Sequence, residues 1–202
     1  MVYYEDDKLI IRDMESADAQ VFTDEFTAQG WHPDIAGYLS RLKDRSENKC
    51  IALTAVYERC PAGYVYVYMC ANEGSFKDKG WPIIVDFNVL KKYQRRGIGN
   101  RLMDAAEQVA SQYADNVCLG VGLCDSYGAA QRMYVKRGYI PDGSGVWYQD
   151  KQCVQYETHR GFVEPEDKDD FFVNGQASNQ VLWEDILCFN WECIIATAQR
   201  GE

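Results

Sequence analysis

The sequence lacks the features of a secreted, membrane-spanning or metal-binding protein. Its N-terminus, Met1 to Asp7, is acidic and has neither the positively charged stretch nor the apolar stretch of a signal peptide. The longest apolar runs are too short to span a bilayer. None of the 8 cysteines forms a Cys-x-x-Cys pair, and most lie in apolar runs, where a reduced thiol packs like a small hydrophobic group. We therefore expect a cytoplasmic protein with no metal ion, no disulfide framework and no membrane partner.

Positive charge is also scarce. The chain carries 21 basic residues against 31 acidic ones, which gives a formal net charge of −10. A field of this sign repels phosphate-rich polymers, so we expect no nucleic-acid partner. The same field favours the approach of a cationic substrate such as an amine, although many proteins are acidic only for solubility. No local motif brings His32 or His159 to Cys124, so a cysteine nucleophile is not indicated.

The length and the hydrophobic content predict a single domain of ordinary size. The chain has 202 residues, and 47% of them are hydrophobic, which is enough to build a core around a sheet. We take residues 1–202 as one domain and 150–202 as a C-terminal segment that supplies its last strands. Within that segment, the acidic run Glu164–Asp170 indicates a solvated loop, and Gln180–Ile195 indicates a closing strand or hairpin.

Hydrophobic periodicity predicts alternating strands and helices. The predicted strands are Lys8–Arg12, Cys50–Tyr57, Gly63–Cys70, Pro82–Leu90 and Val117–Val121. The predicted helices are Ser16–Gln29, Pro33–Arg45, Gly97–Tyr113 and Ser126–Arg137. Pro82–Leu90 is almost continuously apolar, which predicts a central strand buried on both faces. The strand–helix–strand order after it implies a parallel crossover in an otherwise antiparallel sheet, so we predict a mixed α/β fold.

One segment has the composition of an anion-binding loop. Gln94-Arg95-Arg96-Gly97-Ile-Gly99 stands where a strand ends and a helix begins, so free backbone N–H groups and the positive end of the helix dipole point into one small volume. The two glycines remove Cβ atoms that would hold a ligand away, and the two arginines add positive charge. The spacing fits neither a Walker loop nor a dinucleotide-binding fingerprint. Taken alone, the same residues could simply cap the helix.

A second motif follows one strand–helix unit later. Ala130-Gln-Arg-Met-Tyr134-Val-Lys-Arg-Gly138-Tyr139 combines an alanine, an apolar–tyrosine pair and a terminal glycine–aromatic pair. In this order, the two motifs resemble those of the GNAT superfamily, the Gcn5-related N-acetyltransferases. The resemblance extends from about Leu9 to Trp183, and it is to a bacterial subgroup of unassigned substrate.

The resemblance implies a fold, a cosubstrate and a set of site residues. The fold would be a mixed sheet of about six or seven strands, splayed in the middle and flanked by about four helices. The activity would be acetyl-CoA-dependent N-acetyltransfer, in which a primary amine attacks the thioester directly in a ternary complex. The acetyl end would lie near Phe87 and Asn88. The residues that would hold the coenzyme are Val89, Leu90, Gln94, Arg95, Arg96, Gly97, Ile98, Gly99, Asn100 and Ala130.

Tyr134 matches the position of the superfamily's usual general acid. A phenol with a pKa of about 10 keeps its proton at neutral pH and can donate it to the departing thiolate. A tyrosine on a helical stripe can equally be a core residue whose hydroxyl bonds a carbonyl. At Tyr127 the superfamily commonly has an asparagine that contacts the coenzyme, so that contact is not expected here.

The general base is less clear from the sequence. The superfamily often has a glutamate on the strand before the loop, where this chain has Ile83. Asp86 is the nearest substitute, because a buried carboxylate in that strand would have a raised pKa suited to base catalysis. A carboxylate bound to backbone amides is the other interpretation, and many members use water relays alone. Glu73 and Asp78, in the preceding loop, are further candidates.

The acceptor is expected to be a primary amine on a small molecule or a peptide. Trp31, Trp81 and Asn88 are candidate acceptor-binding residues, although tryptophans of this kind are also common in core packing. Two other classes stay open at this point. One is a catalytically inactive acyl-CoA-binding sensor or interaction module, which the lack of a glutamate at Ile83 keeps open and the presence of Tyr134 argues against. The other is an interaction protein whose loop only caps a helix. A homodimer through the last strands is compatible with the fold.

Overall fold

The computed structural model describes residues 1–123, 125–148, 150–154 and 192–195. They belong to two compact units. The first consists mainly of Met1–Asn72 and Phe76–Leu119, and the second contains Glu73–Ser75 and the chain from Gly120 to Thr197. The expectation of a single domain stays a prediction. The acidic run Glu164–Asp170 lies outside the described residues.

The first unit is built on six neighbouring strands of a mixed sheet. The strands follow the chain order across the sheet and are β1 (Val2–Glu5), β2 (Leu9–Asp13), β3 (Cys50–Tyr57), β4 (Cys60–Tyr68), β5 (Ile83–Val89) and β6 (Cys118–Gly122). Neighbouring strands are antiparallel up to β5, and β5 pairs with β6 in parallel. The predicted parallel crossover and mixed α/β class are therefore confirmed. The first strand, β1, was not predicted.

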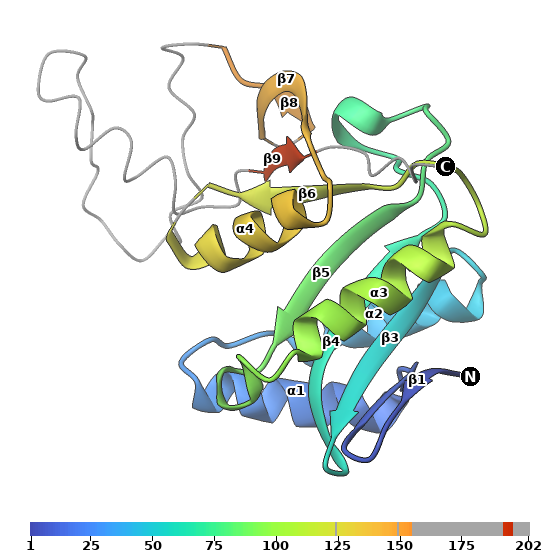
Figure 1. The fold of residues 1–202 in the computed structure, drawn as a ribbon, viewed down its shortest axis with the longest axis vertical. Helices are drawn as coiled ribbons and strands as arrows, with labels where there is room; N and C mark the ends of the chain where they lie inside the picture. The colour runs from blue at the N-terminus through green and yellow to red at the C-terminus, as the bar shows by residue number, and fades with distance from the viewer. Residues whose placement is uncertain (124, 149, 155–191, 196–202) are drawn as a thin grey trace, which may run out of the picture. The chain divides into compact units, whose positions relative to one another are not determined.

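Three helices cover the two faces of this sheet. They are α1 (Ser16–Ala28), α2 (Ile35–Ser46) and α3 (Ile98–Ala110), and α3 lies on the opposite face from α1 and α2 (Figure 1). The face under α1 and α2 holds a largely aromatic cluster that includes Phe22, Phe26, Tyr38, Tyr64 and Tyr66. Because strand side chains alternate between faces, the intervening residues point toward α3. Buried members of this second set are Leu53, Ala55, Val65, Val67 and Ile84.

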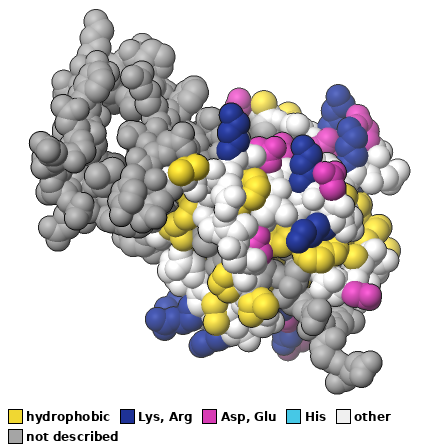
Figure 2. Space-filling view, turned by 90° about the horizontal axis from the view of Figure 1, so that it is seen from above, with side chains coloured by type: hydrophobic (Ala, Val, Ile, Leu, Met, Phe, Trp, Pro, Cys, Tyr) yellow, Lys and Arg dark blue, Asp and Glu magenta, His cyan; other side chains and the backbone are white. Residues whose placement is uncertain are grey.

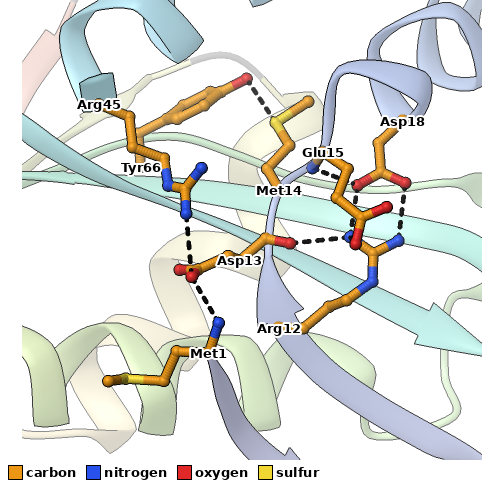
Figure 3. Close-up of polar contacts among 8 residues, drawn as sticks. All are labelled: Met1, Arg12, Asp13, Met14, Glu15, Asp18, Arg45 and Tyr66. Atoms are coloured by element: carbon orange, nitrogen blue, oxygen red, sulfur yellow. Dashed lines mark hydrogen bonds and ion pairs between the residues drawn. The ribbon is translucent and has the colours of Figure 1, made fainter.

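The start of α1 is fixed by a buried ion pair (Figure 3). Asp18 is 3% exposed and accepts two hydrogen bonds from the Arg12 guanidinium, at 2.7 and 2.9 Å. The same carboxylate also accepts from the backbone N–H of Glu15, which completes a capping box. A buried charge is tolerated only when it is paired in this way, so β2 and α1 are held together at their junction.

The strand β5 differs from its sequence-based prediction. Of its residues, only Ile84 is buried, so the expectation of a strand buried on both faces is wrong. Tyr64 pairs with Asn88 and Tyr66 with Val85, so two steps along β4 correspond to three along β5, which is a β-bulge. The parallel pairing with β6 involves Ile83 and Ile84 alone among the described residues. The end of β5 that leads to the loop therefore has no described β6 partner.

The second unit contains one α-helix and three strands within its described part. A 3-10 turn, η3 (Asp125–Tyr127), leads into α4 (Gly128–Lys136). The helix is followed by Gly138 at φ 89°, the left-handed conformation in which a glycine commonly ends a helix. Strand β7 (Pro141–Tyr148) pairs antiparallel with β8 (Lys151–Gln152) and with β9 (Glu192–Ile195). The end of the predicted Gln180–Ile195 segment is thus a strand, and the rest lies outside the described residues.

Candidate active site

The loop between β5 and α3 has the geometry of an anion site. A 3-10 turn, η2 (Lys91–Tyr93), follows β5, and α3 begins at Ile98 with Gly97 at its N-cap in the left-handed conformation, φ 82°. The first turn of α3 contains no acidic residue, and no described side chain caps it. The backbone N–H groups from Ile98 to Asn100 therefore have no partner within the helix. A Cβ added at Gly97 would meet no atom within 4 Å, so the space before the helix is open.

Basic side chains gather around this loop in an otherwise acidic protein. The segment Lys91–Arg101 contains five basic residues and no acidic one, whereas the whole chain has a formal net charge of −10. Arg95 is exposed at φ 62°, and the Arg96 guanidinium lies 5.3 Å from the Tyr57 ring centre and 6.0 Å from that of Tyr93. The helix dipole and these charges act in the same direction, so the loop attracts anions.

The loop is anchored to the end of β5. The Gln94 side chain donates to the carbonyl of Val89 at 3.0 Å, so its role is to hold the loop against the strand. A Cβ added at Gly99 would lie 3.2 Å from Cζ of Phe87, which shows how closely α3 approaches β5. The N–H of Leu90 donates to the carbonyl of Ala62 at 2.9 Å, and the carbonyl of Leu90 accepts from the N–H of Tyr93 at 2.8 Å. The N–H of Leu90 is therefore not free to bind a pantetheine arm, whereas Val89 stays a candidate.

Tyr134 lies in α4, in the second unit. It is 5% exposed and its ring centre is 5.8 Å from that of Tyr139. Burial raises the pKa of Tyr134 above the ordinary tyrosine value, and the nearby Tyr127 raises it further. The phenol therefore keeps its proton throughout the neutral range. Ala130, half-buried on the same helix, precedes it by about one turn.

The structure corrects the interpretation of Asp86 as a buried carboxylate. It lies at the bulge of β5 with φ 51°, and its side chain is 46% exposed. Its carboxylate pairs with Arg41 of α2 at 2.7 Å and accepts no hydrogen bond from a backbone amide of the described residues. The sequence argument failed because a bulge turns Asp86 out of the apolar alternation of the strand. Burial therefore gives no reason to assign Asp86 as a general base.

The candidate acceptor residues do not all come together. Trp31, which is 50% exposed, packs edge-on against Phe26 at 5.0 Å, and Phe26 in turn contacts Tyr64 at 6.0 Å. Asn88 donates to the Tyr64 hydroxyl at 3.3 Å, so Trp31 and Asn88 border the same aromatic cluster. Trp81 precedes the other end of β5 and packs on a different ring, that of Phe76, at 5.6 Å.

Arg41 was not among the candidate residues predicted from the sequence, but the structure places it against Asp86 and the aromatic cluster. Arg41 contacts Asp86, Tyr66 and Tyr68. Its ion-pair partner Asp86 lies 45 positions further along the chain. Nothing in the local pattern of α2 distinguishes Arg41 from an ordinary exposed helix residue. Only the tertiary structure shows that it faces the bulge.

The surface and the ionisable groups show no second concentrated site within the described residues. On the face seen in Figure 2, basic and acidic side chains lie next to one another among hydrophobic ones. The described residues contain no group of three or more histidine, cysteine or acidic side chains placed to hold a metal ion. None of the described helices is long and apolar enough to cross a membrane. Cys124 and His159 lie outside the described residues.

The fold resembles those of several solved acetyltransferases. YncA of Salmonella typhimurium, solved with its cofactor acetyl-CoA, has 13% sequence identity and a TM-score of 0.60, with 97% of this chain and 96% of that one covered. A PaiA N-acetyltransferase of Thermoplasma acidophilum, solved with coenzyme A, has 15% identity and a TM-score of 0.50 over 66% and 91% of the two chains. A ribosomal-protein-S5-alanine acetyltransferase of Vibrio fischeri has 13% identity and a TM-score of 0.56 over 73% and 86%.

At these identities the solved structures establish the fold, which is the predicted GNAT-like α/β fold. No curated protein sequence matches the chain. The sequence pattern of the acetyltransferase (GNAT) family, however, matches residues 12–139, which is more than half of the chain and includes both the loop and α4. The chain therefore belongs to the GNAT acetyltransferase family.

Proposed function

We propose that this chain is an N-acetyltransferase that uses acetyl-CoA and acetylates a primary amine on a small molecule or a peptide. The observation that carries the proposal is the open, positively charged start of α3, where Gly97 adopts a left-handed conformation and the first-turn N–H groups are free of helix partners. The solved relatives that contain acetyl-CoA or coenzyme A support the choice of cosubstrate. The bacterial subgroup, the cytoplasmic location and the absence of a nucleic-acid partner stay predictions.

The loop fits the pyrophosphate of the coenzyme. The N–H groups of Ile98, Gly99 and Asn100 would bind phosphate oxygens, with Arg95 supplying charge from the exposed edge of the loop. The backbone of Val89, at the end of β5 without a described β6 partner, would bind the pantetheine arm. A carboxylate in this loop would repel the same phosphates, and the segment contains none.

The chemistry requires one bond to form and one to break. A bound thioester supplies an electrophilic carbonyl carbon; the amine nitrogen attacks it directly, the C–N bond forms and the C–S bond breaks. The amine loses a proton, and the sulfur leaves as a thiolate that takes one up. Tyr134 would donate this proton, because its buried hydroxyl has a raised pKa and stays protonated at neutral pH. We leave the general base unassigned.

Calorimetric titration with acetyl-CoA tests the proposal. We expect the native protein to bind, and a Gly97→Glu variant to lose binding by at least about tenfold, because the new carboxylate faces the phosphates. The matched control is Gly80→Glu, since Gly80 also has a positive φ, 69°, and open space around it. The Gly80→Glu variant carries the same added charge and a similar backbone strain at a position away from the loop. Its affinity for acetyl-CoA should therefore equal that of the native protein.

Thiol release from acetyl-CoA in the presence of a panel of primary amines tests turnover. Acetylation of any amine, checked by mass spectrometry of the product, would support the enzyme. Tight binding without turnover of any amine would indicate the catalytically inactive acyl-CoA-binding module instead. Failure of the native protein to bind acetyl-CoA would refute both.

A further inference from the structure

The bulge in β5 presents a carboxylate at the edge of an aromatic cluster. Asp86 occupies the extra position of the bulge and adopts φ 51°, a conformation that costs free energy for any residue with a Cβ. Phe87, the next residue, is directed toward Gly99 of α3, on the opposite face of the sheet. Val85 packs against the aromatic cluster, so regular alternation would point Asp86 away from that cluster. The bulge instead places Asp86 on the face covered by α1 and α2, where it meets Arg41.

Arg41 holds this carboxylate through one of its two oxygens. Its Nε and Nη2 atoms lie 3.0 and 2.7 Å from Oδ2 of Asp86. Its Nη1 atom donates to the hydroxyl of Tyr68 at 2.8 Å, and the guanidinium carbon lies 5.2 Å from the Tyr68 ring centre and 5.8 Å from that of Tyr66. These contacts fix the planar guanidinium in position, and the guanidinium fixes the carboxylate.

The other oxygen of the carboxylate is available. Among the described residues, Oδ1 of Asp86 has no hydrogen-bond or ion-pair partner, and the side chain is 46% exposed. Buried hydroxyls belong to the cluster on this face, since the hydroxyl oxygens of Tyr38 and Tyr64 lie 3.4 Å apart and Asn88, two residues after Asp86, donates to that of Tyr64. Burial raises the pKa of Tyr64, and the negative charge of Asp86 is among the further causes, so the carboxylate acts on the cluster.

We propose that Oδ1 of Asp86 binds the ammonium group of the acceptor, and that Arg41 is a positioning residue that holds the carboxylate for this contact. The inference rests on the proposed N-acetyltransferase function and names the acceptor class: amines that carry a positive charge when they bind. Asn88, near which the acetyl end is also expected, lies on the same face of the sheet as Asp86, since it donates to the hydroxyl of Tyr64 in the aromatic cluster. A carboxylate there attracts cations and repels anionic acceptors, in agreement with the acidity of the whole chain.

Steady-state kinetics with Asp86→Asn test this role. Asparagine has the same shape and tolerates a positive φ, so the bulge is expected to fold. Loss of the charged hydrogen bond should raise the KM for a cationic alkylamine by about tenfold or more, with kcat and the Kd for acetyl-CoA within about twofold of native. An arylamine that is uncharged at the assay pH provides the specificity control, because its KM should not change.

Variants of Arg41 test the positioning role. Arg41→Met removes the contacts to Oδ2 and should raise the same KM, whereas Arg41→Lys, which keeps the charge but not the planar geometry, should restore it only in part. Lys43→Met is the matched control, since Lys43 lies on the same helix with 75% of its side chain exposed. The KM of this variant for the cationic amine should equal the native value.

The outcomes separate this inference from the proposed function. If the native protein acetylates amines but Asp86→Asn leaves the KM for cationic amines unchanged, the inference alone is overturned. A large fall in kcat with a shifted pH profile and an unchanged KM would also overturn it, because Asp86 would then act as a base. If the native protein acetylates no amine, the proposed function and the inference fail together.

Discussion

Thr54, at the middle of β3, has a buried hydroxyl without a hydrogen-bond partner among the described residues. It is 0% exposed and lies opposite Arg12 in β2 and Tyr64 in β4. A buried polar group left unpaired costs free energy, whereas an apolar group of the same shape does not. We therefore expect Thr54→Val to raise the free energy of unfolding by about 1 kcal/mol, measured by urea denaturation.

Thr23 provides the matched control for this substitution. Its hydroxyl donates to the carbonyl of Ala19 at 2.9 Å, so Thr23→Val removes a bond that is made and should bring no gain in stability. Destabilisation by Thr54→Val would show that the hydroxyl of Thr54 is satisfied, for example by a buried water molecule.

At the scale of elements, the loop before α3 combines its proposed role in coenzyme binding with backbone strain. Arg95 adopts φ 62°, which is unfavourable for a residue with a Cβ. We expect Arg95→Gly to raise the free energy of unfolding by about 0.5 kcal/mol, since relief of strain exceeds the added chain entropy of glycine. The same change should weaken acetyl-CoA binding several-fold, because it removes a cation from the loop. Urea denaturation and calorimetry measure the two effects.

Asp78→Gly is the control that distinguishes relief of backbone strain from loss of a cation in the loop, because Asp78 adopts φ 65° in another exposed loop. Asp78→Gly should bring a similar gain in stability with no loss of affinity for acetyl-CoA. If Arg95→Gly binds acetyl-CoA as tightly as the native protein, Arg95 does not contribute to the coenzyme site.

The sequence predicted some elements better than others for physical reasons. Helix α3 was predictable because its apolar residues keep the helical period, and strand β3 because it is an almost continuous apolar run. The loop was predictable because two glycines and two arginines stand at a strand-to-helix junction. Strand β1 was missed because Val2–Glu5 is short and has no buried residue, so it shows no apolar alternation.

The bulge and the Asp86–Arg41 pair could not be predicted from local pattern. The apolar run Pro82–Leu90 suggests an uninterrupted buried strand, and hydrophobic periodicity does not report an extra residue in a ladder. The pair joins α2 to β5 across 45 residues, so it depends on how the two elements pack. The loop proposed to bind the coenzyme can thus be recognised from a single segment of sequence, whereas the proposed acceptor site cannot.

Across the whole molecule, buried thiols and phenols make stability depend on alkaline pH. Burial raises the pKa of Cys50 to about 11, and it raises that of Cys118 to about 12. Burial also raises the pKa of Tyr68 to about 12, together with its hydrogen bond to Asp44. These groups ionise in the unfolded chain at lower pH than in the folded protein. Their contribution is therefore complete below about pH 9 and is lost as pH rises through about 11 to 12.

We accordingly expect the free energy of unfolding to be nearly constant from neutral pH to about pH 9 and to fall steeply above it, in urea denaturation at a series of pH values. Cys118→Ala removes one such thiol and should make the alkaline fall less steep, whatever its effect at neutral pH. Cys60→Ala, at an exposed position, should leave the slope unchanged. A stability that stays flat to pH 11 would mean that these groups ionise as readily in the folded protein as in the unfolded chain, which their burial argues against.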